Sequence, residues 1–493
     1  FRRVLFRSEK HQLYAGFDYS IAQKKNHFYT FIVEGFPDGK LDFIGNALQY
    51  EKNGVPKGTE ELSRRVGFTG NVNYIYNNRY FMDLSFRVDG SSLFGTKNKF
   101  APFWSAGIGW NVHNEKFMQN QNIVNNLRIR GSYGETGSQQ FSSYQALSTF
   151  QSYTGKRYII WNGSELMGLG NEKLKWQVTK QLNGGVEVGL FDGRLSASFD
   201  IYSKKTSNLL SQMDLPLANG FSSYVDNVGE VKNTGYEAMI SGYLMRDTHR
   251  NIIWSMTAKL AYTKNEITKL SEAIKRQNEL YKSKDVEINQ LLYEGYAQNS
   301  IWAVPSMGID PSTGYEIFLD KNGNITDKWN PSDKRYFGVD EPKYRGNIST
   351  YFAWKDLSVN LSFAYQWGGQ QYNETLLNKV EVTNGEIDKN NVDSRVLKKR
   401  WQHIGDVKPY KGYGSVETKA TSRFVMDDNV FQFQSASVEY RLHSDFLRDK
   451  WKVETISIGA NMSDIFYISS IKRERGTSYP FARRLALTLS LMF

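Results

Sequence analysis

The stretch FARRLALTLSLMF, residues 481–493, alternates apolar and polar side chains up to the last residue of the sequence. Successive side chains of an extended strand point to opposite faces, so this alternation separates the stretch into two different faces. One face would carry Ala486, Thr488 and Ser490. The apolar face would consist of Leu485, Leu487, Leu489, Leu491 and Phe493. The stretch therefore predicts a β-strand that is apolar on one side only.

The same alternation recurs along the chain, for example at 79–89, 193–203, 251–264 and 357–367. We count about fourteen such runs of about ten to thirteen residues, close to the length that a tilted strand needs to cross a bilayer. Strands of soluble sandwiches are usually about half as long. Many of the runs begin or end on Trp or Tyr, as in the interfacial girdles of membrane barrels. The pattern predicts an all-β protein, specifically a large antiparallel transmembrane β-barrel.

The connections between these runs fall into two classes. Residues 76–79, 191–194 and 355–356 predict tight turns, two of them with Asn-Asn or Asp-Gly at the centre. Long polar stretches separate other strands, and we expect a short helix within 265–291. The long stretches are 135–174, 265–343 and 368–428. Outer-membrane barrels have short periplasmic turns and long external loops, so the two classes agree with the barrel prediction.

Composition excludes several other classes of protein. Among 493 residues there is no Cys, which removes disulfides and thiol chemistry. The mean hydropathy is −0.54, and no apolar run is long enough for a transmembrane helix. The formal net charge is +11, but the basic residues are dispersed and the densest clusters are 398–400 and 472–473. We therefore expect no nucleic-acid partner.

The two ends of the sequence carry different signals. The terminal Phe493, on an amphipathic last strand, resembles the signal that the outer-membrane barrel-assembly machinery reads. Residues 1–8, FRRVLFRS, match the translation of a common sequencing adapter, so we expect them to be an artefact and exclude them from the fold. The predicted barrel portion is then 9–493.

No motif in the sequence predicts catalysis, a cofactor or a metal. Residues 90–97 approximate a phosphate loop but lack its Gly-Lys-Ser/Thr ending. Residues 320–326 resemble a calcium loop, yet Gly323 falls at the fourth position instead of the sixth, which favours an Asn-Gly hairpin turn. The six histidines show no short metal-binding spacing. We expect a protein that is not an enzyme.

Candidate substrate contacts are aromatic residues of the long loops. Trp161, Trp302 and Trp401 offer flat faces on which sugar rings stack, and the alternative reading is loop packing or membrane girdle. Alternation also places a set of charged side chains on the lumenal face, for structural use or for substrate contact. These are Asp83, Arg87, Asp89 and Glu237.

Short phrases of this chain resemble, in order, those of the SusC/RagA family of TonB-linked outer-membrane proteins. The N-terminal ones are RVDGSSLFG (87–95), FWSAGIGWN (103–111), LRIRGSYGETG (127–137) and NEKLKWQ (171–177). The others are GLFDGRL (189–195), NVGEVKNTGYE (227–237), GIDPSTG (308–314) and YPFARR (479–484). Each phrase alone is short, but the shared order over nearly the whole chain is specific.

The resemblance implies a transporter of the Gram-negative outer membrane, embedded in lipid and energised through TonB. It also implies a SusD-like surface lipoprotein as partner and oligosaccharide or peptide fragments as cargo. A complete member carries a signal peptide and a plug domain before the barrel. We find neither here, so the resemblance implies that signal peptide, plug and first strands are missing, and that this is the C-terminal part of the barrel. Two alternatives stay open: a passive porin-like or structural outer-membrane barrel, and a soluble all-β carbohydrate-processing enzyme.

Overall fold

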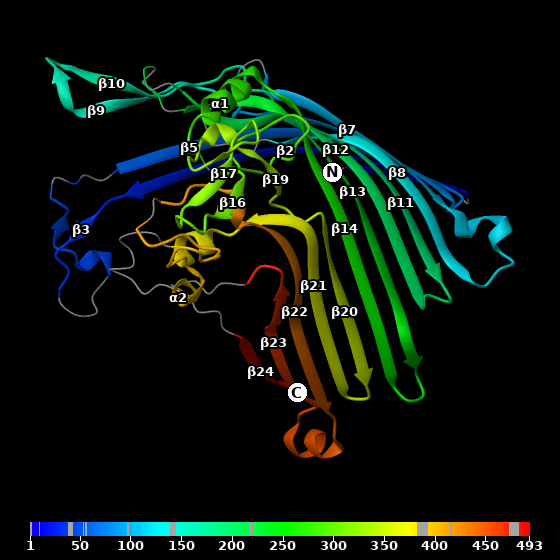
Figure 1. Cartoon of the computed structure of the whole chain (residues 1–493). Coiled ribbons are helices and arrows are strands. Elements are labelled where there is room, and N and C mark those ends of the chain that lie inside the picture. Colours follow the sequence, from blue (N-terminus) through cyan, green and yellow to red (C-terminus); the bar gives the residue numbers. More distant parts are fainter. Residues whose placement is uncertain are drawn as a thin grey trace.

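A single antiparallel sheet of fifteen strands dominates the computed structural model, and each strand pairs with the strands next to it in the order β1-β2-β5-β6-β7-β8-β11-β12-β13-β14-β20-β21-β22-β23-β24. The structure describes all residues except 1, 9, 38–42, 53, 55–56, 96–97, 139–143, 216–217, 219, 222, 287, 382–392, 415–416 and 473–482. Figure 1 shows the sheet curving strongly from one edge to the other. The all-β antiparallel prediction is confirmed.

The strands of the main sheet have the following bounds: β1 (Arg2–Arg7), β2 (His11–Thr30), β5 (Lys57–Tyr76), β6 (Tyr80–Ser91), β7 (Phe100–Asn111), β8 (Val124–Ser138), β11 (Gln177–Leu190), β12 (Leu195–Asp214), β13 (Ser223–Asp247), β14 (Ile252–Leu270), β20 (Tyr344–Trp354), β21 (Leu357–Tyr372), β22 (Val425–Leu442), β23 (Thr455–Ser469) and β24 (Arg484–Met492). Fourteen of them lie within residues 11–492, which agrees with the predicted number. The remaining strand, β1, pairs with β2. This pairing does not test the adapter origin of residues 1–8, which stays a prediction.

Several strands are longer than predicted. β13 has 25 residues and β12 has 20, about twice the length of the alternating runs. The ladder hydrogen bonds continue where the outward side chains become polar, so the apolar alternation marks only the part of each strand that faces lipid. The prediction was therefore wrong for residues 135–138, 265–270, 368–372 and 425–428, which extend β8, β14, β21 and β22 instead of lying in loops.

Smaller elements occupy the long connections. They are β3 (Val33–Glu34) with β4 (Gln49–Tyr50), β9 (Thr149–Tyr158) with β10 (Trp161–Gly168), β15 (Ser300–Ala303) with β19 (Arg335–Val339), and the three-stranded sheet β16 (Ser306–Ile309), β17 (Glu316–Leu319) and β18 (Ile325–Thr326). The helices are α1 (Glu272–Lys282) and α2 (Arg395–Lys399). Single helical turns occupy 44–46, 112–114, 116–118, 331–333, 376–380, 422–424 and 447–451. None of the described helices is long and apolar enough to cross a membrane, a finding that does not concern strands.

The predicted turns are confirmed. Asn77 and Asn78 have φ values of 51° and 53°, and Asp192 has a φ of 55°, as tight primed hairpin turns require. The loop at Asp320 is a hairpin turn between β17 and β18, because the Asp320 carboxylate accepts hydrogen bonds from the backbone N–H groups of Asn322 and Asn324, both at 2.8 Å. Figure 1 places most of the short turns at one end of the sheet and the long connections at the other.

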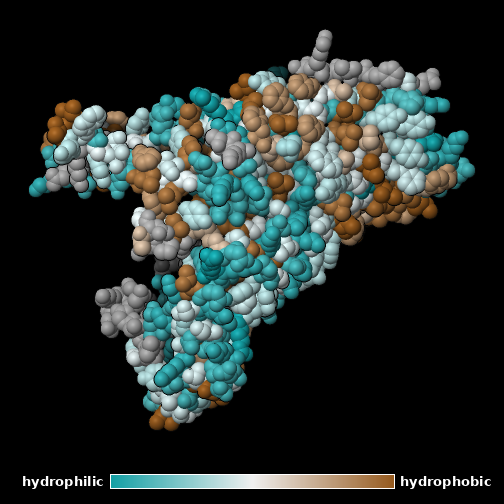
Figure 2. Space-filling model, turned by 90° about the horizontal axis from the view of Figure 1, so that it is seen from above, coloured by the Kyte–Doolittle hydropathy of each residue, from teal (hydrophilic) through white to brown (hydrophobic). Residues whose placement is uncertain are grey.

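The outward face of the sheet carries a row of stacked aromatic side chains. Tyr236, Tyr262, Tyr344 and Trp367 lie on four adjacent strands, with successive ring centroids 5.1, 5.0 and 5.3 Å apart. Phe199, which lies on the same face nearer the short turns, is 47% exposed. Figure 2 shows hydrophobic residues gathered along the lower border of the right-hand part of the visible face, beside more hydrophilic areas. An apolar band bounded by aromatic rings is the arrangement of a lipid-facing barrel wall.

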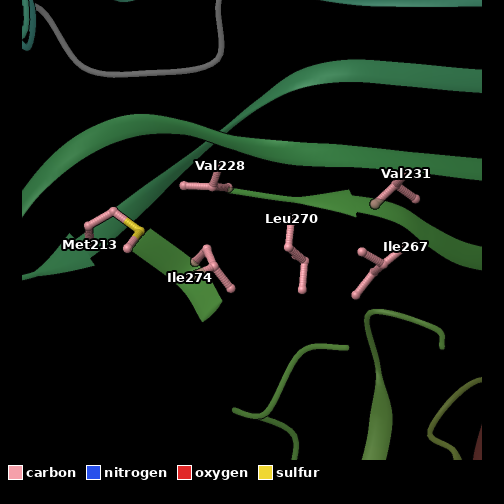
Figure 3. Packing of buried hydrophobic residues seen from close by; sticks show 6 residues of the cluster. All are labelled: Met213, Val228, Val231, Ile267, Leu270 and Ile274. Carbon is pink, nitrogen blue, oxygen red and sulfur yellow. The ribbon is translucent and has the colours of Figure 1, made fainter. Parts of the chain in front are cut away.

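Helix α1 confirms the short helix predicted within 265–291. Its N-terminus is capped by Ser271, whose side chain accepts a hydrogen bond from the backbone N–H of Ile274. Ile274 is buried against β12, β13 and β14, at the ends of these strands that lead into the long connections (Figure 3). The cluster consists of Met213, Val228, Val231, Ile267, Leu270 and Ile274. The long strands thus end in a small water-excluding core.

The close approach of neighbouring strands makes Gly235 sensitive to substitution. A Cβ atom at this position would lie 2.2 Å from the backbone oxygen of Tyr262 and 2.6 Å from the hydroxyl of Tyr202. We expect Gly235→Ala to force β13 away from β14 and to reduce the free energy of unfolding by roughly 1–3 kcal/mol. The measurement is the fraction of heat-modifiable, folded protein on gels at rising denaturant. Gly107→Ala is the control, because its Cβ would meet nothing nearer than 3.8 Å; equal losses in both variants would refute the steric argument.

Candidate functional site

The inward face of the sheet is lined with paired charges. The Nε–H of Arg87 donates to both carboxylate oxygens of Asp89, at 2.8 and 2.7 Å. Arg130 contacts Glu187 at 3.1 Å and Asp200 at 2.6 Å. These side chains lie on the sheet face opposite Phe199, as the alternation predicts. The wall they form suits contact with water, because its charges are partnered yet partly exposed.

The other lumenal predictions have definite places. Glu237 lies opposite Asp200 on β12 and Ala261 on β14, which puts it on the inward face as expected. Asp83 accepts a hydrogen bond from the side-chain amide of Asn73 on the neighbouring strand. The predicted use of Glu237, either in the structure of the wall or in substrate contact, stays a prediction.

The two longest connections are joined by a buried cluster of charged side chains around Arg423. The guanidinium donates to both oxygens of Glu316, at 3.1 and 2.9 Å, and also to both oxygens of Glu381. A further bond reaches the carbonyl oxygen of Pro409 at 2.7 Å. Glu316 comes from β17, and Glu381 and Arg423 come from the connection between β21 and β22. We call this group the Arg423 cluster. It holds together two connections that lie far apart in the sequence.

Arg423 keeps the carboxylate of Glu316 ionised. Burial by itself raises the pKa of Glu316, but the hydrogen bonds and charge of Arg423 outweigh burial, so this pKa lies below its ordinary value. The carboxylates of Glu316 and Glu381 raise the pKa of Arg423 although burial alone would lower it. Glu316 and Arg423 are therefore both charged at any pH near neutrality.

Acidification is expected to loosen the loops. A carboxyl whose pKa is lower in the folded state contributes its full stability above its ordinary pKa, about 4.3 for Glu, and loses it as the pH falls through the lower folded value. We expect the tryptophan fluorescence of the loops to stay constant from about pH 7 to about pH 5 and to change below about pH 4. In Glu316→Gln the part of this change due to Glu316 should be absent. An unaltered acid profile in that variant would assign the transition to other carboxyls.

A cavity of about 830 Å³ lies between these loops and the ends of β21, β22 and β23. Four of its lining residues are acidic: Asp285, Asp340, Glu374 and Asp428. Burial, and then the charges of Asp428 and Glu374, raise the pKa of Asp340. No sequence pattern signals this cavity, because its residues come from separate segments with no common spacing. Among the described residues, no group of three or more His, Asp or Glu side chains has the arrangement of a metal site.

The structure places the three candidate tryptophans in three different substructures. Trp161 begins β10 and is 71% exposed on a hairpin that projects from the sheet (Figure 1). Trp302 is only 9% exposed and packs against tyrosines of the same connection, with ring centroids 4.6 Å from Tyr293 and 5.8 Å from Tyr336. Trp401 donates a hydrogen bond from its indole N–H to the carbonyl oxygen of Pro311 at 2.9 Å. Trp161 is therefore the most accessible of the three, whereas Trp302 and Trp401 pack within loops.

A family profile described as "TonB dependent receptor-like, beta-barrel" matches residues 3–461. The chain belongs to this family. The curated relatives include TonB-dependent receptor P3 of Formosa agariphila, 29% identical over 485 residues, which cover 91% of this chain and 45% of the relative. TonB-dependent receptor SusC of Bacteroides thetaiotaomicron is 25% identical over 395 residues, or 77% of this chain and 38% of SusC. The resemblance to the SusC/RagA family is thereby confirmed.

The solved structures agree on the fold of this TonB-dependent receptor-like chain. The structure of the RagAB peptide transporter matches with a TM-score of 0.83 at 23% identity, and covers 96% of this chain and 51% of that one. A second RagAB structure, of the peptide importer in an "open-open" state, matches with a TM-score of 0.84 at 22% identity and covers 100% of this chain and 54% of that one. The chain therefore spans about half the length of the relatives that it matches.

Proposed function

We propose that this chain forms part of the wall of an outer-membrane transporter that takes up oligosaccharides or peptides with energy delivered through TonB. The family membership supports the energised mechanism. The observation that carries the proposal is that one face of the sheet is apolar and the other is charged. One face presents Phe199 and the aromatic row to lipid, and the other presents Arg130, Glu187 and Asp200 to the lumen. A wall of this kind separates lipid from a hydrated cargo.

The partners of this transporter are part of the proposal. RagAB is described as a peptide transporter, and SusC is named a TonB-dependent receptor. By likeness to these proteins we assign a SusD-like surface lipoprotein as partner and a Gram-negative outer membrane as location. The chemistry is binding and gating, with no covalent step in the cargo. Trp161, Trp302 and Trp401 are kept as candidate contacts for cargo, and Phe493 as the barrel-assembly signal.

The two outer strands of the described sheet each have an unpaired edge, so the sheet does not close into a barrel by itself. Among the described strands, β24 pairs with β23 alone, and β1 covers only residues 12–17 of β2. Lipid does not tolerate unpaired strand edges. We therefore place further strands in the functional barrel, as in plugged transporters of about 22 strands. The division into residues 1–8 as an adapter artefact and 9–493 as barrel belongs to the same proposal, and sequencing the gene across its 5′ end tests it.

The test of function is uptake in cells. The full-length protein and its lipoprotein partner are expressed in a host with and without a functional TonB, and labelled oligosaccharides and peptides are supplied outside. We expect uptake of one cargo class that disappears without TonB or after a protonophore. Uptake that persists in both conditions would favour the passive porin-like barrel instead.

A further inference from the structure

Three lysines stand side by side on the outward face of the sheet. Lys180 on β11 lies directly opposite Lys205 on β12, and Lys205 lies directly opposite Lys232 on β13. Neighbouring strands are about 4.8 Å apart, so the three stems form a continuous row. We call Lys180, Lys205 and Lys232 the lysine row. Like charges directly opposite each other destabilise a sheet, so the row needs a source of negative charge.

Carboxylates of the protein meet this need only in part. Glu135 contacts Lys180 at 3.0 Å, and Glu230 contacts Lys205 at 2.7 Å. Both lysines keep about half of their side chains exposed, at 52% and 48%. Exposed ion pairs of this kind contribute little and exchange readily. Glu266 lies directly opposite Lys232 on β14, but its carboxylate contacts Lys264 at 2.9 Å. Lys232 itself has no carboxylate within 4.0 Å among the residues that the structure describes, so the row and its neighbours carry more positive than negative charge.

The position of the lysine row relative to the aromatic row indicates what lies beside it. Lys232 precedes Tyr236 on β13 by four residues, or about 13 Å of strand, on the same face and toward the long connections. Lys205 is placed in the same way relative to Ile201, which is opposite Tyr236. The aromatic rings mark the edge of the apolar band. The lysine row therefore lies at the depth of lipid headgroups, on the side of the external loops.

We propose that the lysine row is a binding site for a phosphate-bearing lipid of the outer leaflet. Adjacent ammonium groups converge on one phosphate, while the acyl chains follow the apolar face below the aromatic row. When the lipid binds, the ion pairs of Glu135 with Lys180 and of Glu230 with Lys205 either break or persist while the same lysines also contact the headgroup. The inference rests on the proposed outer-membrane location but goes beyond transport, since it assigns a lipid site outside the lumen.

The experiment measures lipid retention and not uptake, so its outcome is independent of whether the protein transports the expected cargo. The full-length protein is purified, equilibrated with dioleoyl phosphatidic acid or with dioleoyl phosphatidylcholine, and examined by native mass spectrometry. We expect phosphatidic acid to be retained in preference. Each lysine near the surface contributes about fivefold to such binding, so the triple change of Lys180, Lys205 and Lys232 to Gln should reduce retention by more than tenfold.

Three controls make the result decisive. The triple change of Lys321, Lys328 and Lys408 to Gln, in the external loops, removes the same charge elsewhere and should leave retention unchanged. The triple change of the row to Arg should preserve retention, which separates lost charge from lost folding. Equal retention by the row Gln variant and the wild type would overturn the proposal. Displacement of the lipid by millimolar inorganic phosphate alone would overturn it as well, because the site would then be one for free phosphate.

Discussion

Arg423→Ala is expected to release the two longest connections from one another while the sheet stays folded. The substitution leaves Glu316 and Glu381 buried without their common cation, and removing one partner of a buried ion pair costs about 3–5 kcal/mol. Both carboxylates are nearly inaccessible to water, with side-chain exposures of 1% and 0%. The measurement is hydrogen exchange of β17 and of residues 417–424, which should become fast. Exchange within β12 and β13 should not change.

Arg448→Ala is the matched control for this prediction. Arg448 also contacts a carboxylate, that of Asp445 at 2.7 Å, but the two side chains are 61% and 84% exposed. Exposed pairs contribute about 0–1 kcal/mol, so exchange should stay as in the wild type. Similar protection of the loops in both variants would mean that apolar packing holds the loops together without the Arg423 cluster.

Phe199→Arg is expected to prevent stable insertion of the sheet into lipid. The side chain projects from the outward face, and the Phe199 ring lies 6.0 Å from that of Tyr236 in the aromatic row. Arginine on the lipid-facing wall costs about 2–4 kcal/mol at the middle of the bilayer and less toward its surface; Phe199 lies just inside the aromatic row, so we expect a loss of about 1–3 kcal/mol. The measurement is the free energy of unfolding of the full-length protein from lipid vesicles, obtained by denaturant titration.

Ser198→Arg tests the same depth on the opposite face. Ser198 precedes Phe199 and lies opposite Glu187 of the charged inner wall. An arginine there meets water and a carboxylate, so we expect a change of less than about 1 kcal/mol. If Ser198→Arg destabilised the protein and Phe199→Arg did not, the assignment of the two faces would be reversed. Since both changes introduce the same side chain at adjacent positions, a general intolerance of arginine would affect them equally.

The sequence by itself determined the class of the fold and the direction in which side chains point. Alternation over 193–203 placed Phe199 outward and Asp200 inward, because a strand reverses its side-chain direction at every residue. Asn77, Asn78 and Asp192 predicted tight turns, because these residue types tolerate positive φ. The order of the family phrases led to the family that the profile match then showed. These signals are local, so a single sequence contains them.

Only the tertiary structure decided which distant residues meet. The Arg423 cluster joins residues as far apart as Glu316 and Arg423, and the acidic cavity draws its walls from several connections. No spacing in the sequence signals either one. The full length of β12 and β13 was also hidden, because ladder hydrogen bonds continue after the apolar alternation ends. Likewise, Lys180, Lys205 and Lys232 form a row only through the register of three strands, which cross-strand hydrogen bonding sets.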